Sequence, residues 1–195
     1  MIAARGRDRA ALSRRTALLA LALQPCVSLQ LSAQPALPTE VSAELPGARL
    51  LGSGRLTFMM LHVYDARLWV GHDFKADGFA SMPLALELEY ARSLHGRLVA
   101  ERSLEEMKRQ GAVSDEAGER WLAAMVQAFP DVAKGDRLTG LYRPGESARF
   151  FMNGKVRSEI RDADFARRFF GIWLSPQTSE PKLRQSLLGL SRAGS

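Results

Sequence analysis

Residues 148–160 read ARFFMNGKVRSEI and carry the signal that decides the fold. The dipeptide Asn153-Gly154 separates two β-prone runs, and both of its residues tolerate a positive φ. Such a pair favours a type I′ turn, whose twist matches that of two antiparallel strands. The segment therefore predicts a hairpin, and with it a sheet in which the strands run antiparallel.

Further β-prone runs precede this hairpin at residues 50–58, 61–70, 84–90 and 136–142. In the run 84–90, LALELEY, the leucines and Tyr90 share one face, and we expect Glu87 and Glu89 on the other face to contact water. Apolar spacing and capping residues predict helices over residues 98–110, 114–129 and 162–174, and a short one that begins near Pro181. This order of elements predicts an α+β fold, with an antiparallel sheet and a helical layer on one face.

The N-terminus has the pattern of an export signal. Residues 1–33 carry five arginines, an apolar run at 17–23 and small residues at the end, so we expect a signal peptide and a location in the bacterial periplasm. The pair Arg14-Arg15 also allows the twin-arginine route. We expect residues 34–46, which contain three prolines, to be an extended leader, 47–190 to form the domain, and 191–195 to be a tail.

Composition excludes several classes of protein. The 195 residues are 46% hydrophobic and 25% charged, which is typical of a globular domain. Most of the net charge of +6 lies in residues 1–33, so the domain lacks the dense basic face that nucleic-acid binding requires. No apolar run is long enough for a helix that spans a bilayer.

Cysteine and histidine usage argues against a metal or disulfide framework. Cys26 is the only cysteine and falls within the expected signal, so the mature chain would have no thiolate ligand. His62, His72 and His95 do not have the spacing of metal ligands, and we expect no metal site. The segment Gly52-Ser53-Gly54 lacks the further residues of a phosphate-binding loop.

Several short segments, taken together, resemble the chalcone isomerase-like family and in particular its exported bacterial branch. They occur in the family's order between about residues 48 and 190, at 51–54, 63–69, 129–136, 150–154, 165–175 and 187–189. The resemblance implies an open-faced β-sandwich, in which a large antiparallel sheet packs against helices and a cleft lies between the two layers.

The resemblance also implies which positions to examine for chemistry. The family's plant enzymes close a flavanone ring without a cofactor, using an arginine that steadies a phenolate. Here Arg55 falls one position before the expected arginine, Tyr64 replaces a threonine, and His95 and Arg102 fall roughly where a tyrosine and an asparagine would stand. These replacements argue against flavanone formation, and whether the protein is an enzyme stays open.

The favoured interpretation is a non-catalytic periplasmic protein that binds a small apolar or amphipathic ligand in the cleft. A fatty acid, another carboxylate or haem would suit such a site, and we expect no other cofactor. The candidate ligand-binding residues are Tyr64, Arg55, His95 and Arg102. We expect the stretch around Trp121 to cover the gap opposite the strand of Tyr64.

Two other interpretations stay open. One is a cofactor-independent isomerase or intramolecular lyase, with Tyr64 and His95 as its acid–base pair. The other is a protein-interaction module of the cell envelope, which predicts an exposed apolar patch and no internal cavity. Each candidate residue also has a purely structural explanation: Tyr64 as a core residue, Arg102 as an exposed partner of nearby glutamates, and His95 as a solvated turn residue.

Overall fold

The computed structural model describes residues 35–190. The expected signal peptide of residues 1–33 and the tail of residues 191–195 lie outside this range, so export stays a prediction. Within 35–190, none of the helices has the length and apolar character needed to cross a membrane.

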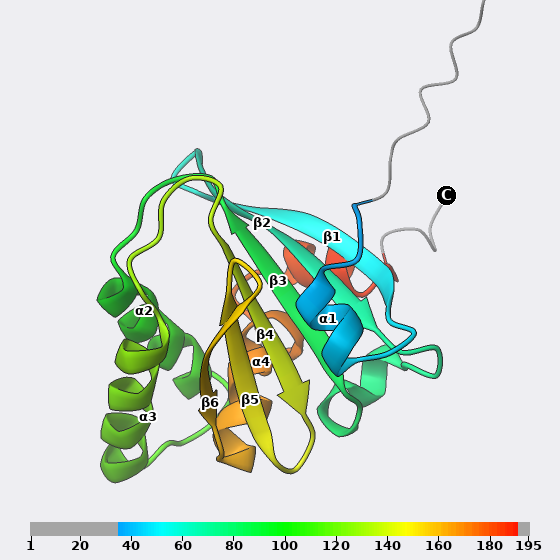
Figure 1. The fold of residues 1–195 in the computed structure, drawn as a ribbon. Coiled ribbons are helices and arrows are strands. Elements are labelled where there is room, and N and C mark those ends of the chain that lie inside the picture. The colour runs from blue at the N-terminus through cyan, green and yellow to red at the C-terminus, as the bar shows by residue number, and fades with distance from the viewer. Residues whose placement is uncertain (1–34, 191–195) are drawn as a thin grey trace, which may run out of the picture. The chain divides into compact units, whose positions relative to one another are not determined.

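The framework is a six-stranded antiparallel sheet in which neighbouring strands follow one another in chain order (Figure 1). The strands are β1 (Arg49–Phe58), β2 (Leu61–Val70), β3 (Leu84–Tyr90), β4 (Arg137–Arg143), β5 (Ser147–Met152) and β6 (Lys155–Ile160). The turn between β5 and β6 has Asn153 at φ 50° and Gly154 at φ 81°. These values confirm the hairpin that the dipeptide predicts.

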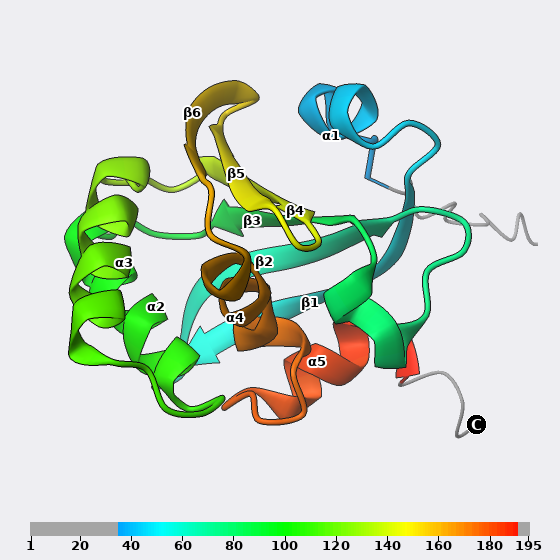
Figure 2. The same cartoon turned by 90° about the horizontal axis from the view of Figure 1, so that it is seen from below.

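Four helices pack against one face of the sheet (Figure 2). They are α2 (Gly96–Lys108), α3 (Asp115–Ala128), α4 (Ala163–Leu174) and α5 (Pro181–Leu187), and a 3₁₀ segment, η1 (Ala76–Ser81), links β2 to β3. The Ser114 and Asp162 side chains cap α3 and α4 by accepting hydrogen bonds from the N–H groups of Ala117 and Phe165. The six-stranded antiparallel sheet with helices packed on one face confirms the predicted α+β open-faced sandwich.

The opposite face of the sheet is covered by a helix that the sequence analysis did not predict. Within the stretch expected to be extended, α1 (Thr39–Glu44) is helical, so that prediction is wrong for these residues. Pro38 precedes the first turn, where a missing N–H costs nothing, and Val41 and Leu45 then face the sheet four residues apart. They form a second apolar cluster with Trp69, Leu141 and Phe151, among others.

The same covered face corrects the expectation that both glutamates of β3 contact water. Glu87 is only 2% exposed; its carboxylate accepts hydrogen bonds from Arg67 Nη1 and Trp69 Nε1, both at 3.0 Å. Glu89 is partly exposed and pairs with Arg67 Nη2 at 2.9 Å. A buried carboxylate is tolerated when it is paired and hydrogen-bonded. Strand β3 is therefore covered on both faces.

Glycines in β1 let α5 approach the sheet closely. A Cβ at Gly52 would lie 2.2 Å from the carbonyl oxygen of Ser186 and 2.5 Å from that of Leu187. A Cβ at Gly54 would lie 2.6 Å from Leu183 Cδ1. The segment 52–54 thus serves helix packing.

We expect Gly52→Ala to lower the free energy of unfolding by about 3 kcal/mol, since the added methyl meets backbone that cannot move aside. Urea unfolding followed by circular dichroism measures this change. Gly71→Ala is the matched control, because a Cβ there meets nothing within 4 Å. If the two variants were equally stable, the close contact with α5 would not be the reason that position 52 requires glycine.

Candidate functional site

A cavity of about 350 Å³ lies between the helical face of the sheet and helices α2 and α4. Its walls are mostly apolar and aromatic. The sheet contributes Leu56, Phe58, Val63, Tyr64, Leu88, Tyr90 and Leu138, and the helices and adjoining loops contribute Leu94, Leu98, Val99, Phe129, Phe169, Ile172 and Trp173. This volume and lining are typical of sites for small apolar ligands.

Strand register determines the sheet side of the cavity. Leu56 of β1 pairs with Tyr64 of β2, which pairs in turn with Tyr90 of β3. The three side chains therefore lie in one row across the strands, and all three line the cavity. The two tyrosine rings contact edge to face, with their centroids 6.0 Å apart.

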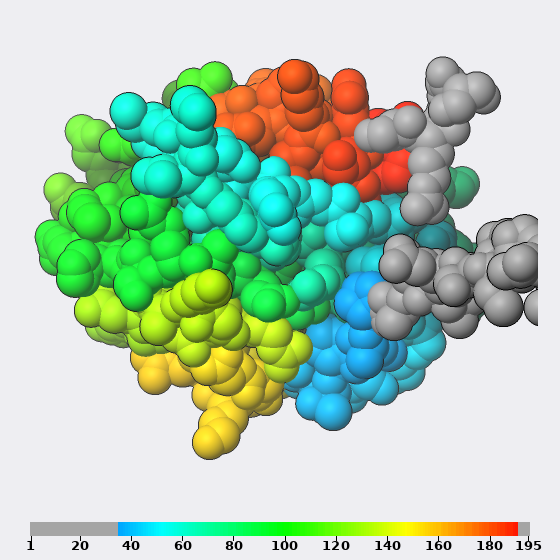
Figure 3. Space-filling model, turned by 90° about the horizontal axis from the view of Figure 1, so that it is seen from above, coloured from blue at the N-terminus to red at the C-terminus, as the bar shows by residue number. Residues whose placement is uncertain are grey.

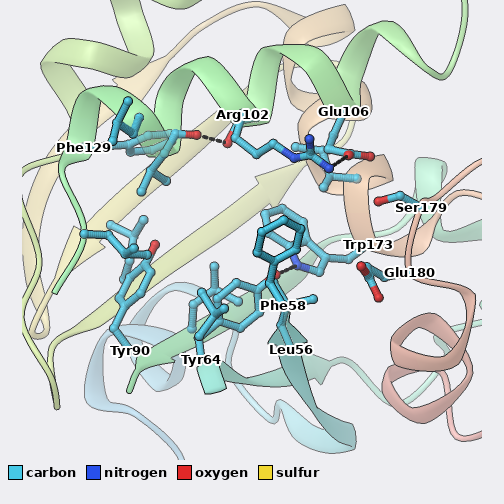
Figure 4. Close-up of a pocket in the computed structure, with 18 of the residues that line it drawn as sticks. Leu56, Phe58, Tyr64, Tyr90, Arg102, Glu106, Phe129, Trp173, Ser179 and Glu180 are labelled. Carbon is cyan, nitrogen blue, oxygen red and sulfur yellow. Dashed lines mark hydrogen bonds and ion pairs between the residues drawn. The ribbon is translucent and has the colours of Figure 1, made fainter. Parts of the chain in front are cut away.

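The phenol of Tyr64 is held by α4. Trp173 Nε1 donates a hydrogen bond to Tyr64 Oη at 2.9 Å, which Figure 4 shows below the Arg102 and Glu106 side chains of α2. Because Tyr64 accepts this bond, its own proton remains available to a ligand. Burial raises the pKa of both Tyr64 and Tyr90 well above the ordinary value of a phenol. Both tyrosines can therefore act as neutral hydrogen-bond donors.

An ion pair on α2 lines the opposite wall. Arg102 Nη2 lies 2.6 Å from Glu106 Oε1, and Arg102 Nη1 lies 3.2 Å from Glu105 Oε2. Arg102 thus makes the local pairs that the sequence suggests, and it also lines the cavity. Glu106 is 7% exposed, and its Oε2 accepts no hydrogen bond from any of the described residues. The guanidinium of Arg102 is already shared between carboxylates.

Arg92 is a cavity residue that the sequence analysis missed. Its exposed side chain lines the cavity, and within residues 35–190 it takes part in no ion pair of 4 Å or less. The signal that could have identified it is the alternation of β3, because Arg92 follows Tyr90 by two residues. Glu106, Tyr90 and Trp173 were also missed as lining residues.

Arg55 lies outside the cavity. It belongs to the opposite face of β1, where its Nε lies 2.8 Å from Asp65 Oδ1. Leu56, one position later, lines the cavity instead. Consecutive strand residues point to opposite faces, so a shift of one position removes the guanidinium from the site.

His95 lines a second pocket, together with Asp131 and Asp136, and is not among the residues that line the cavity. It precedes α2, and its Nδ1 lies 3.3 Å from Asp131 Oδ2, while the Gly96 N–H donates to Asp131 Oδ1 at 2.8 Å. Hydrogen bonds from Gly96 and His95 hold the pKa of Asp131 below its ordinary value. The structure therefore does not bring His95 into one site with Tyr64.

Trp121 does not cover the gap, which corrects that expectation. It is buried in the core, and its Nε1 donates to Asp162 Oδ2 at 2.8 Å. Helix α2 forms this side of the cavity through Val99, Arg102 and Ser103. Helix α3, which carries Trp121, instead contacts α2 and the edge strand β6, and the Trp121 ring packs edge to face against Phe165 of α4.

The cavity offers few ligands to a metal or haem. Its lining includes no histidine, cysteine or methionine. The groups of the lining that could ligate a metal through a charged or ionisable oxygen are the phenols of Tyr64 and Tyr90 and the carboxylates of Glu106 and Glu180. Among residues 35–190, no group of three or more histidine, cysteine, aspartate or glutamate side chains is arranged to hold a metal ion. Of the side chains that serve as axial ligands of haem iron, the lining offers only the phenols of Tyr64 and Tyr90, and Tyr64 Oη already accepts a hydrogen bond from Trp173.

Comparison with known proteins agrees with this architecture. A fatty-acid binding protein of Arabidopsis thaliana has the same fold, with a TM-score of 0.57 and 13% sequence identity over 75% of this chain and 89% of the plant chain. An uncharacterized protein of Haemophilus influenzae is 28% identical over 143 residues, which cover 73% of this chain and 69% of the relative. A family model described as chalcone isomerase-like matches residues 33–189. Since this match extends over most of the sequence, the chain belongs to the chalcone isomerase-like family.

Proposed function

We propose that this protein binds a small amphipathic acid, such as a fatty acid, in the cavity between the sheet and helix α2. The observation that carries the proposal is the apolar cavity of about 350 Å³, whose charged groups come from only four residues. An apolar chain would replace water along the leucine and aromatic walls, which favours binding by the hydrophobic effect.

The charges of the lining support an acidic headgroup at Arg92. Arg92 and Arg102 are balanced by Glu106 and Glu180, but Arg102 is already paired with Glu105 and Glu106. Arg92 is therefore the cation available to an incoming carboxylate. The hydroxyl of Tyr64 can donate a further hydrogen bond from inside the cavity.

We also propose that binding proceeds without catalysis. The position of the plant enzymes' arginine is occupied by Leu56, which can neither donate a hydrogen bond nor stabilise an anion. The raised pKa values of Tyr64 and Tyr90 disfavour a role as bases, and His95 lies elsewhere. With export predicted from residues 1–33, the ligand would be met in the periplasm.

Filling the cavity with a larger side chain should weaken binding. We expect Leu56→Trp to weaken the affinity for dansylundecanoic acid roughly tenfold or more, because the indole occupies space that the ligand needs. Fluorescence titration measures the affinity. Thr57→Trp is the matched control, since this adjacent residue is exposed and does not line the cavity. Unchanged affinity of Leu56→Trp, in a variant that folds, would place the ligand elsewhere.

Removal of the Arg92 guanidinium should weaken the binding of an acid but not the binding of its ester. We expect Arg92→Ala to weaken binding of dansylundecanoic acid about fivefold, or ~1 kcal/mol, and to leave binding of its methyl ester unchanged. Arg55→Ala serves as the control because Arg55 lies on the other face of β1 and pairs with Asp65. An equal loss for acid and ester would contradict a carboxylate contact.

The affinity for a neutral ligand should not depend on pH in the range where Tyr64 and Tyr90 stay protonated. Because burial raises the pKa of Tyr64 and Tyr90, both stay protonated as pH rises from about 6 to about 9, below even the ordinary phenol pKa. The affinity for the methyl ester should therefore be constant over this range, as measured by the same titration. A fall in affinity towards alkaline pH, with the fold intact by circular dichroism, would indicate that a phenol ionises in the site.

A further inference from the structure

The turn between β1 and β2 exposes a continuous apolar surface. Phe58, Met59, Met60 and Leu61 are 61%, 79%, 95% and 51% exposed, respectively, and we call these four residues the apolar tip. The tip projects at the top of Figure 1, and Figure 3 views the molecule from that side. Large apolar side chains rarely gather in this way on a surface that contacts only water.

Backbone conformation shows that local turn chemistry does not explain these residues. Met59 and Met60 have φ values of 47° and 63°, in the left-handed region that disfavours such side chains. At the β5–β6 turn, the same chain uses Asn153 and Gly154 for φ values of 50° and 81°. Strained conformations of this kind cluster at functional sites. Met59 and Met60 therefore make this turn less favourable than the asparagine and glycine of the β5–β6 turn would.

The apolar tip is continuous with the mouth of the cavity. Phe58 belongs to the tip and also lines the cavity. Leu98, an exposed residue near the start of α2, lines the cavity as well. Arg92 lies near the turn end of the same hairpin, because the N–H of the preceding residue, Ala91, donates to the carbonyl of Val63 at 2.9 Å. A molecule that enters between Phe58 and Leu98 would pass from the apolar tip directly into the cavity.

We infer that the apolar tip inserts into the interfacial region of a phospholipid bilayer, and that the cavity takes up its amphipathic ligand from there. This inference rests on the proposed function, since it names the source of the ligand. A bilayer accommodates a convex apolar turn without a complementary groove, and the flexible methionine side chains suit a surface that makes no directional contacts. Arg92, which has no ion pair among the described residues, fits the phosphate groups that surround an inserted tip.

The test is the flotation of the protein with vesicles of phosphatidylcholine and phosphatidylglycerol. We expect the double variant Met59→Asn, Met60→Gly to bind these vesicles about tenfold more weakly than the unsubstituted protein. Its melting temperature should stay the same or rise, because asparagine and glycine suit the turn. Its affinity for dansylundecanoic acid in vesicle-free buffer should be unchanged. Val156→Ser, which alters an exposed apolar residue on β6, is the matched control and should float normally.

The outcomes separate this inference from the proposed function. The inference is overturned if the unsubstituted protein does not float with vesicles, or if the double variant floats equally well. Cross-linking of the tip to an envelope protein without vesicle binding would assign it to a protein partner and also overturn the inference. If flotation depends on the tip but dansylundecanoic acid is not bound in buffer, insertion stands and the proposed ligand class fails.

Discussion

The register of three paired strands, which places Leu56, Tyr64 and Tyr90 opposite one another, is the constraint on which the cavity depends. Leu56, Tyr64 and Tyr90 form one row on the helical face, and Arg55, Asp65 and Glu89 form the adjacent row on the other face. A slip of one residue would exchange an apolar and aromatic wall for a charged one. The burial of the first row and the ion pair between Arg55 and Asp65 in the second favour the same register.

The outer face of the sheet supports this arrangement through ion pairs and hydrogen bonds around α1. Glu44 of α1 pairs with Arg143 at 2.7 Å and with Arg149 at 2.8 Å, and Thr139 donates to Glu40 at 2.9 Å. Together with the buried Glu87, these contacts span β2 to β5. Ion pairs and hydrogen bonds in a buried layer favour one geometry, because a displacement would separate the charged partners. Glu40 contributes through Oε1 alone, since its buried Oε2 accepts no hydrogen bond from the described residues. The sheet is thus held from one side while a space remains on the other.

The space remains open because of what α2 presents to the sheet. Its cavity-facing residues include Val99, Ser103 and Glu106, which are small or polar and do not fill the gap. The Ser103 hydroxyl donates to the carbonyl of Val99 at 2.8 Å, which satisfies it within the helix. The start of α2 is fixed at Gly96, where a Cβ would lie 2.2 Å from the carbonyl oxygen of Phe129. Helix α2 therefore cannot move freely to close the cavity.

Local patterns were sufficient for most of the secondary structure, since alternation, caps and the Asn153-Gly154 turn act within a few residues of the chain. They failed for α1, whose short helix is stabilised by the sheet it covers, and for Glu87, whose burial depends on partners from β2. Of the four candidate ligand-binding residues, Tyr64 and Arg102 line the cavity, whereas Arg55 and His95 do not. The set of side chains that share a cavity depends on strand register and on helices that are distant in the chain. In this protein, only the tertiary packing of β1, β2 and β3 against α2 and α4 determines that set.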